Sequence, residues 1–388
     1  MTLEIANKLI SLRRARGVSQ EELAAVIGVS RQAISKWERG EASPDIDNII
    51  LLSRFYDVSI NELLCCGEEY EIAAEETAPE SEPECAESEL LPAPKTEPVP
   101  EDGAFSDTVS DIVCAARADL ELFGIAGGDI TVTLEGTEKE KAECSIYTEG
   151  SELHIETPRN DRRFGIFVRR TTLKISVGVP DTVRRVQAEL FGGDAKLEGV
   201  TAKDLYIKTG GGDIDSLGSH SKGLVLTTGG GDISVRAAVA DTAQIRTGGG
   251  DIEVEDMKVK ELAELHTGGG DMEVTCEAGS VSAVSGGGDI ELSARTRSLE
   301  AKSGGGDLTL KASGADRVLA KTGGGDIELK LGDITGASFE LASAGGEAVL
   351  LAYGKRIESG KRVNASVGSG AAKVELKSGG GDITAFVE

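Results

Sequence analysis

The side chains best suited to chemistry lie between positions 30 and 39, where amide, hydroxyl and cationic groups follow one another closely. Gln32 carries an amide, which can read adenine through two hydrogen bonds, and Arg31 and Lys36 carry cations that can read guanine. These groups suit the base edges in the major groove of duplex DNA. To act together, they must be presented on one side of a regular element.

The residues just before them predict a helix that ends in a tight turn. Ser19 and Glu22 have the spacing of a capping box, so a helix should begin at Gln20. Gly28 should end this helix, because glycine adopts the left-handed conformation of a helix C-terminus at the least cost.

A second helix is predicted directly after this turn. Ser30 can cap its N-terminus, and Ile34 and Trp37 recur on one side at helical spacing. The opposite side carries the polar side chains of Gln32, Ser35, Lys36 and Arg39, with Arg31 on the flank. Further helices expected over 3–16, 45–56 and 59–64 would complete a five-helix, all-α domain spanning 1–66.

The motif SQEELAAVIGVSRQAISKWERG at 19–40 and the following segment resemble the phage-repressor-like (Cro/C1, xenobiotic-response-element) helix-turn-helix family, over roughly residues 3 to 64. The resemblance implies a regulator that binds double-stranded DNA, with Arg31, Gln32 and Lys36 on the bases and Gln20 on a phosphate. Further backbone contacts would come from Arg13, Ser30, Ser35, Arg39 and Ser43. A homodimer on a two-fold operator is expected. The alternative is a bundle that lost DNA binding and contacts a protein.

The net charge of the whole chain argues against DNA binding, but the charge of its N-terminal part does not. The 388 residues carry a net charge of −26, yet residues 1 to 40 hold seven Lys and Arg against four Glu. No apolar run reaches the ~18 residues that a membrane span needs, so a cytoplasmic protein without a membrane span is expected. No catalytic set, metal-ligand spacing or cofactor motif stands out, and an enzyme is not expected.

Residues 67–104 differ in composition from both neighbours. Within 68–102 there are thirteen acidic residues, one lysine and six of the nine prolines, and no apolar periodicity. This composition predicts a disordered, self-repelling linker.

The remainder, 105–388, is dominated by a repeat whose marker is GGGD. The marker ends at Asp213, Asp232, Asp251, Asp271, Asp289, Asp307, Asp326 and Asp382, and a Ser or Thr precedes each glycine run. The flanking segments alternate apolar and polar residues, as in Ile252 and Val254 around Glu253. Two short strands per repeat of about 19 residues predict an all-β parallel β-solenoid, with glycines at a corner that would strain other residues. A meander of antiparallel hairpins is the competing fold.

Three segments upstream of the clear repeats, at 130–134, 153–156 and 173–179, are predicted to be strands of degenerate first rungs of the same solenoid. With the GGDI signature at 127–130, the region from about 120 to 388 resembles an adhesin-like β-strand-repeat family of unknown function, found in many bacterial proteins. The resemblance implies a β-solenoid but no activity.

Stacked aspartates repel one another, so each needs a partner. The expected partner is a backbone N–H group of the next rung's turn, and a ladder of bound cations is the alternative. The whole chain is therefore predicted to be a DNA-binding transcriptional regulator whose solenoid senses, scaffolds or oligomerises. The alternative is a structural or interaction protein, with the envelope as one location, whose solenoid binds an unknown protein or ligand while the N-terminal domain only anchors it to DNA or regulates its own gene.

Overall fold

The computed structural model describes residues 9, 12–13, 16, 18, 20, 23, 31–38, 102–105, 109–158 and 172–387. They belong to two compact units, which are treated separately. Only a few positions are described of the helices expected at 3–16 and from Gln20. The helices expected at 45–56 and 59–64, the segment 67–101, and Ser30, Arg39 and Ser43 lie outside the described residues.

In the first unit, helix α3 (Arg31–Glu38) coincides with the second predicted helix of the motif. Ile34 and Trp37 lie three positions apart on it and are only 1% and 7% exposed. Leu9 and Leu23, which come from earlier parts of the unit, are buried as well. One side of α3 is therefore fixed by apolar packing, as the sequence pattern predicts.

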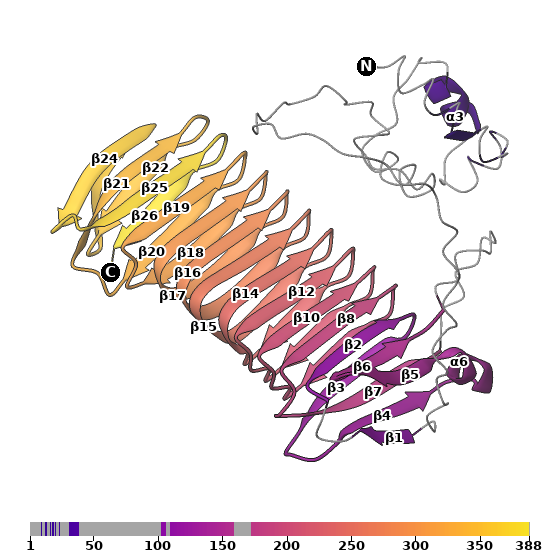
Figure 1. Ribbon diagram of the computed structural model, residues 1–388. Helices are drawn as coiled ribbons and strands as arrows, with labels where there is room; N and C mark the ends of the chain where they lie inside the picture. The colour runs from indigo at the N-terminus through magenta and orange to yellow at the C-terminus, as the bar shows by residue number, and fades with distance from the viewer. Residues whose placement is uncertain are drawn as a thin grey trace, which may run out of the picture. The chain divides into compact units, whose positions relative to one another are not determined.

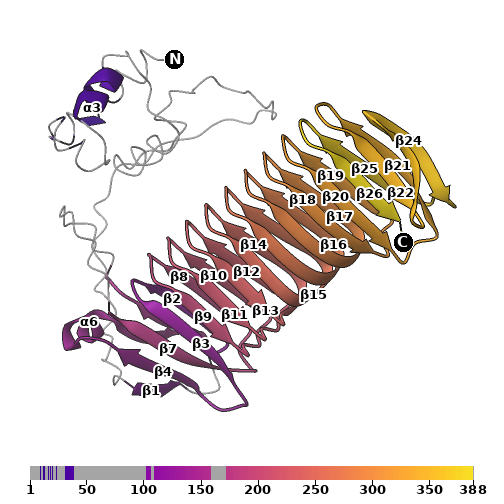
Figure 2. The same ribbon diagram turned by 180° about the vertical axis from the view of Figure 1, so that it is seen from behind.

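The second unit consists of two ladders of parallel strands, and the chain passes from one to the other in each rung (Figures 1 and 2). Ladder A contains β8 (Arg185–Leu190), β10 (Asp204–Thr209), β12 (Gly223–Thr228), β14 (Val239–Thr247), β19 (Arg317–Thr322), β25 (Ala372–Ser378) and β21 (Gly336–Ser343). Ladder B contains β9 (Ala195–Glu198), β11 (Ile214–Leu217), β13 (Ile233–Arg236), β18 (Leu308–Ser313), β20 (Ile327–Gly332), β26 (Ile383–Val387) and β22 (Ala348–Ala352). Three long strands, β15 (Ile252–Thr267), β16 (Met272–Ser285) and β17 (Ile290–Ser303), run from ladder B into ladder A of the next rung.

Aliphatic side chains at alternate positions fill the interior between the ladders. Ile233 pairs with Ile252, Ile252 with Met272, and Met272 with Ile290, and all four side chains are buried. The polar residues between them point outward, which is the alternation that predicted the strands. Parallel pairing of successive rungs confirms the predicted solenoid, and the antiparallel meander is wrong for these rungs.

The N-terminal end of the solenoid departs from chain order. β2 (Asp111–Ala116) lies between β8 and β6 (Glu152–Glu156), and β3 (Asp119–Ile125) lies between β9 and β7 (Lys174–Pro180), all in parallel. The predicted rung strands at 153–156 and 173–179 are thus confirmed. The predicted rung at 130–134 is wrong, because β4 (Ile130–Glu135) pairs antiparallel with β7.

Antiparallel strands close this end. β1 (Asp102–Phe105) pairs with β4, and β5 (Ser145–Glu149) pairs with β6, after helix α6 (Glu138–Glu143). Residues 102–104, which composition assigned to the linker, are thus the first residues of β1.

The C-terminal end of the solenoid also departs from chain order and is also closed by antiparallel strands. β25 lies between β19 and β21, and β26 lies between β20 and β22, so the last strands of the chain are enclosed by earlier ones (Figure 1). β24 (Arg362–Gly368) and β23 (Lys355–Gly360) pair antiparallel with β21 and β22. Charged antiparallel strands at an edge discourage the addition of further strands.

Candidate nucleic-acid interface and the GGGD corner

Helix α3 has an orientation that the sequence predicted. With Ile34 and Trp37 inward, Lys36 is exposed. Arg31, Gln32 and Ser35 lie within the helix, but their side chains are outside the described part of the structure. The helical backbone places positions 32, 35 and 36 away from the Ile34–Trp37 side.

A buried carboxylate anchors the end of α3. Glu38 is 6% exposed, and its two oxygens accept hydrogen bonds from Arg13 Nε at 2.5 Å and Arg13 Nη2 at 2.9 Å. Gln20 Nε2 donates to the same carboxylate at 2.8 Å, and Arg13 Nη1 donates to the Val18 carbonyl at 3.0 Å. A bidentate Arg–carboxylate ion pair is among the stronger polar contacts in proteins.

Two of the predicted phosphate contacts, Arg13 and Gln20, are therefore brought together by Glu38. In the sequence, Glu38 stands out only as a negative charge, and its role in holding Arg13 and Gln20 was not predicted. Its position contained the signal, because Glu38 follows Ile34 by four residues and so lies toward the buried side of the helix. A carboxylate there needs a cationic or N–H partner, since an unpaired buried charge is costly.

In the solenoid, the GGGD corners are joined by a chain of carboxylate-to-amide hydrogen bonds. The Asp251 N–H donates to Asp232 Oδ1 at 2.8 Å, and the Asp271 N–H donates to Asp251 Oδ1 at 2.8 Å. Bonded aspartates are 18 to 20 residues apart in the central rungs. The series starts at Asp119 and continues to Asp382, which binds the Glu347 N–H. The predicted bonding of each aspartate to the next rung's turn is confirmed.

The hydroxyl before each glycine run forms a second inter-rung link. Thr247 Oγ1 donates to the Gly231 carbonyl of the previous rung at 2.7 Å. The same oxygen accepts N–H groups from Gly249 at 3.4 Å and Gly250 at 3.1 Å. Donation to the previous rung recurs at Thr209, Thr228, Thr267, Ser285, Ser303, Thr322, Ser343 and Ser378. These buried hydroxyls are thereby satisfied, as buried polar groups generally are.

The reason for the glycines differs from the one predicted. None of Gly248, Gly249 and Gly250 has a φ in the left-handed range, so backbone strain does not select them. A Cβ at Gly248 or Gly250 would instead collide with the carbonyl group of Gly229 or Gly231 in the previous rung. A Cβ at Gly249 would meet no atom within 4 Å. Close stacking of rungs therefore requires the first and third glycines but not the middle one.

No cluster of three or more His, Cys, Asp or Glu suited to a metal ion occurs among the described residues. Burial raises the pKa of the Cys114 and Cys276 thiols to about 12 and that of Cys144 to about 11. These thiols stay protonated at neutral pH and are poor nucleophiles.

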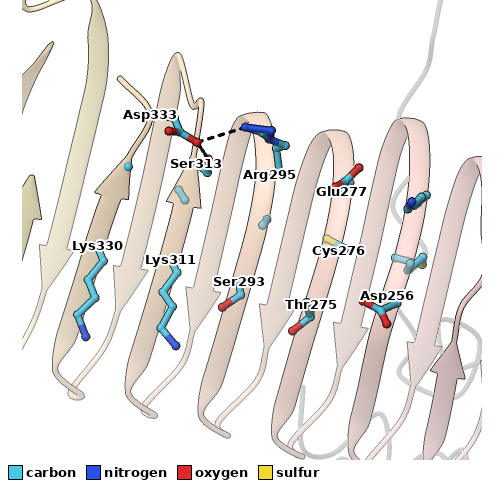
Figure 3. A pocket seen from close by; sticks show the side chains of 15 residues that line it. Asp256, Thr275, Cys276, Glu277, Ser293, Arg295, Lys311, Ser313, Lys330 and Asp333 are labelled. Carbon is cyan, nitrogen blue, oxygen red and sulfur yellow. Dashed lines mark hydrogen bonds and ion pairs between the residues drawn. The ribbon is translucent and has the colours of Figure 1, made fainter. Parts of the chain in front are cut away.

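A groove of about 770 Å³ lies at the corner opposite the GGGD turns, where the rungs vary in length. Figure 3 shows Asp333 reaching across neighbouring rungs to Arg295 and Ser313. Asp333 accepts from Arg295 Nη2 at 3.2 Å and from Ser313 Oγ at 2.6 Å. Lysines and acids both line the groove, so it has no single charge preference.

Residues 111–385 match the model of the family described as Toastrack DUF4097. The chain belongs to the Toastrack family. Its solenoid is hereafter the Toastrack unit. Residues 9–63 match a second family model, described as helix-turn-helix. No helix in the described part of the chain is long and apolar enough to cross a membrane.

The N-terminal part is similar to known regulators. The HTH-type transcriptional activator BcrR of Enterococcus faecalis is 44% identical over 73 residues, which cover 19% of this chain and 35% of that protein. The cryptic phage CTXphi transcriptional repressor RstR of Vibrio cholerae is 36% identical over 63 residues, covering 16% of this chain and 57% of RstR. The chain thus spans about a third to three fifths of the length of these relatives.

Two solved structures are similar to the Toastrack unit in outline. A proposed adhesin of Bacteroides fragilis aligns over 73% of this chain and 94% of its own, with 14% identity and a TM-score of 0.37. A proposed adhesin of Parabacteroides merdae aligns over 75% and 98%, with 15% identity and a TM-score of 0.31.

Proposed function

We propose that this protein is a transcriptional regulator that binds duplex DNA through the outward side of α3. The observation that supports this most is the orientation of α3, whose buried Ile34 and Trp37 leave Lys36 exposed on the other side. Similarity of residues 9–63 to helix-turn-helix regulators supports it further.

Base contacts are assigned to Arg31, Gln32 and Lys36, because amide and cationic groups can form paired hydrogen bonds with base edges. Gln20 keeps a second amide hydrogen besides the one that binds Glu38, and that hydrogen is assigned to a phosphate. Arg13 would act at the backbone while holding Glu38. The remaining backbone contacts are assigned to Ser30, Ser35, Arg39 and Ser43.

The proposed organisation is a DNA-binding domain at 1–66, an acidic linker at 67–101 and a Toastrack module that begins with β1 at Asp102. The module would scaffold or oligomerise the regulator and thereby pair two DNA-binding domains on a two-fold operator. Working on DNA, the protein would act in the cytoplasm of a bacterium, as a binder rather than an enzyme.

Selection of duplexes from a random pool by the full-length protein tests this function. The selected duplex should bind roughly 10³-fold or more tighter than an unrelated one, and its affinity should fall steeply as salt rises. If no selected duplex shows salt-dependent binding, the proposal is contradicted, and a protein-binding role for the N-terminal unit is favoured.

A further inference from the structure

The outward side of ladder A is unusually basic at its C-terminal end. The cations there, defined as the basic patch, are Lys302, Arg317, Lys321, Arg362, Lys373 and Lys377. They lie on β17, β19, β25 and the adjoining β24, strands that neighbour one another or flank β21. Their side chains are exposed or half-buried, while the alternate residues of the same strands fill the core.

The strand register places like charges next to one another. Lys321 pairs with Lys302 on one side and with Lys377 on the other. Arg317 pairs with Lys373, and Arg362 pairs with Ala342 on β21, the next strand after β25. Like charges directly opposite in a sheet are destabilising. The lysine-to-lysine and arginine-to-lysine pairings themselves do not stabilise the fold, which favours an external anion as their counterpart.

Acidic neighbours compensate the basic patch only in part. Glu375 lies 2.7 Å from Lys377 and 3.5 Å from Lys321, and Glu340 lies 3.6 Å from Lys377. Glu300 pairs with Lys302. These three carboxylates face the six cations, so a surplus of positive charge remains at an exposed surface. Exposed pairs of this kind are weak and exchange readily for other partners.

The middle strands of the Toastrack unit, β15 to β17, have the opposite sign in ladder B. In ladder B and the adjoining corner of these strands, the exposed acids are Glu253, Glu255, Asp256, Glu273, Glu277 and Glu291, against the cations Lys258 and Arg295. The whole chain has a net charge of −26. The basic patch is therefore a local departure from the charge of the protein and not a consequence of its composition.

We propose that the basic patch binds the phosphate backbone of duplex DNA, flanking the site that α3 occupies. This inference rests on the proposed function, since DNA held by the N-terminal unit is presented to the patch at raised effective concentration. Strands β17, β19, β25, β21 and β24 span four inter-strand spacings, about 19 Å. Over that length a duplex presents on the order of ten phosphates, so several cations can be matched together.

The test compares two variants of the full-length protein on a duplex that extends well beyond the selected site. Lys321→Gln with Lys377→Gln removes two central charges of the patch. Lys258→Gln with Lys311→Gln removes two exposed charges that lie outside the patch and is the matched control. Each lost phosphate contact lowers the slope of log affinity against log salt by about 0.9, so between 50 and 200 mM salt the wild type should lose about 12-fold more affinity than the patch variant. The control should keep the wild-type slope.

A third variant, Lys321→Arg with Lys377→Arg, keeps both charges and should retain the wild-type slope. On a duplex trimmed to the selected site alone, the patch variant and wild type should bind alike. A patch variant that equals wild type on the long duplex overturns the inference, as does an equal loss in the control with Lys258 and Lys311 replaced. Failure of wild type to bind any duplex refutes the proposed function itself, which is a different result.

Discussion

Glu38 in the N-terminal unit and Asp251 in the Toastrack unit are both acids held by hydrogen bonds, but they are held in different ways. Glu38 is buried, and its partners are the side chains of Arg13 and Gln20, 25 and 18 residues away. Asp251 is exposed, and its partner is the backbone N–H of Asp271 in the next rung. The first contact occurs once, whereas the second recurs from rung to rung.

A contact made once, between side chains in a buried place, concentrates stability in a few residues. A contact repeated through the backbone distributes stability over many rungs, as nearest-neighbour coupling does in repeat proteins. We therefore expect single substitutions to be severe around Glu38. In the Toastrack unit they should be severe only where they prevent two backbones from approaching.

The largest effect is expected for Glu38→Ala, which leaves the Arg13 guanidinium without its buried partner. Removing one member of a buried ion pair costs about 3–5 kcal/mol. Trp37 is the only tryptophan, so its fluorescence during urea unfolding reports on the N-terminal unit alone. Asp251→Ala is the control and should leave the Trp37 transition in place. An unchanged Trp37 midpoint in Glu38→Ala would show that the Arg13 pair does not anchor α3.

The next largest loss of stability is expected for alanine at Gly250 but not at the neighbouring Gly249. Gly250→Ala forces a methyl group against the Gly231 carbonyl group and should cost roughly 1–3 kcal/mol or more, as overpacking does. Gly249→Ala places its methyl in open space and should be neutral, or stabilising by up to about 1 kcal/mol through the unfolded state. Urea unfolding followed by the circular dichroism of the strands measures both. Equal destabilisation by the two substitutions would mean that rung spacing does not select these glycines.

A smaller effect is expected for Asp251→Ala, which removes one hydrogen bond to the next rung. A net loss of about 0.5–1.5 kcal/mol is typical for one such bond. Asp251→Asn keeps an oxygen that can accept the Asp271 N–H and should lose less. The same unfolding assay ranks the two variants, and a larger loss in the asparagine variant would indicate that the charge, not the acceptor, matters.

The smallest effect concerns Glu140, a third held acid, which joins α6 to the segment before β7. Hydrogen bonds from Thr172 and Thr137 lower the pKa of Glu140 to about 2. Because the folded-state pKa lies below the unfolded value, this contribution is present above about pH 4.5 and is lost as pH falls toward 2. The difference in midpoint between wild type and Glu140→Gln should therefore shrink from pH 5 to pH 2. A difference that stays constant over that range would contradict the assignment.

Much of the Toastrack unit follows from its sequence. Alternation around residues such as Ile252 and Val254 predicted strands with one buried face, and the regular GGGD spacing predicted stacked rungs. Rung order at the two ends was not predictable. Alternation specifies which side chains face inward but not which strand lies alongside, so nothing marked β2 for the place between β6 and β8.

The candidate site was predictable to a different degree. Helical spacing predicted the buried side of α3, because the large apolar side chains of Ile34 and Trp37 fall on the same side of the helix and are stabilised by burial. The partners of Glu38 were not predictable, since Arg13 and Gln20 reach it only through the tertiary fold. The glycines were predicted for a turn but are needed for close approach, a property of neighbouring rungs that a single repeat does not reveal.

The outward side of α3 is proposed to read DNA sequence, and selection of duplexes by the Gln32→Ala variant tests this proposal most directly. The variant should lose about 1–3 kcal/mol on the preferred wild-type duplex and tolerate other bases at one position of the site. Gln20→Ala, assigned to a phosphate, should instead weaken all duplexes alike and keep the wild-type base preference. If Gln32→Ala selects the same sequence as wild type with the same stringency, α3 does not read bases as proposed.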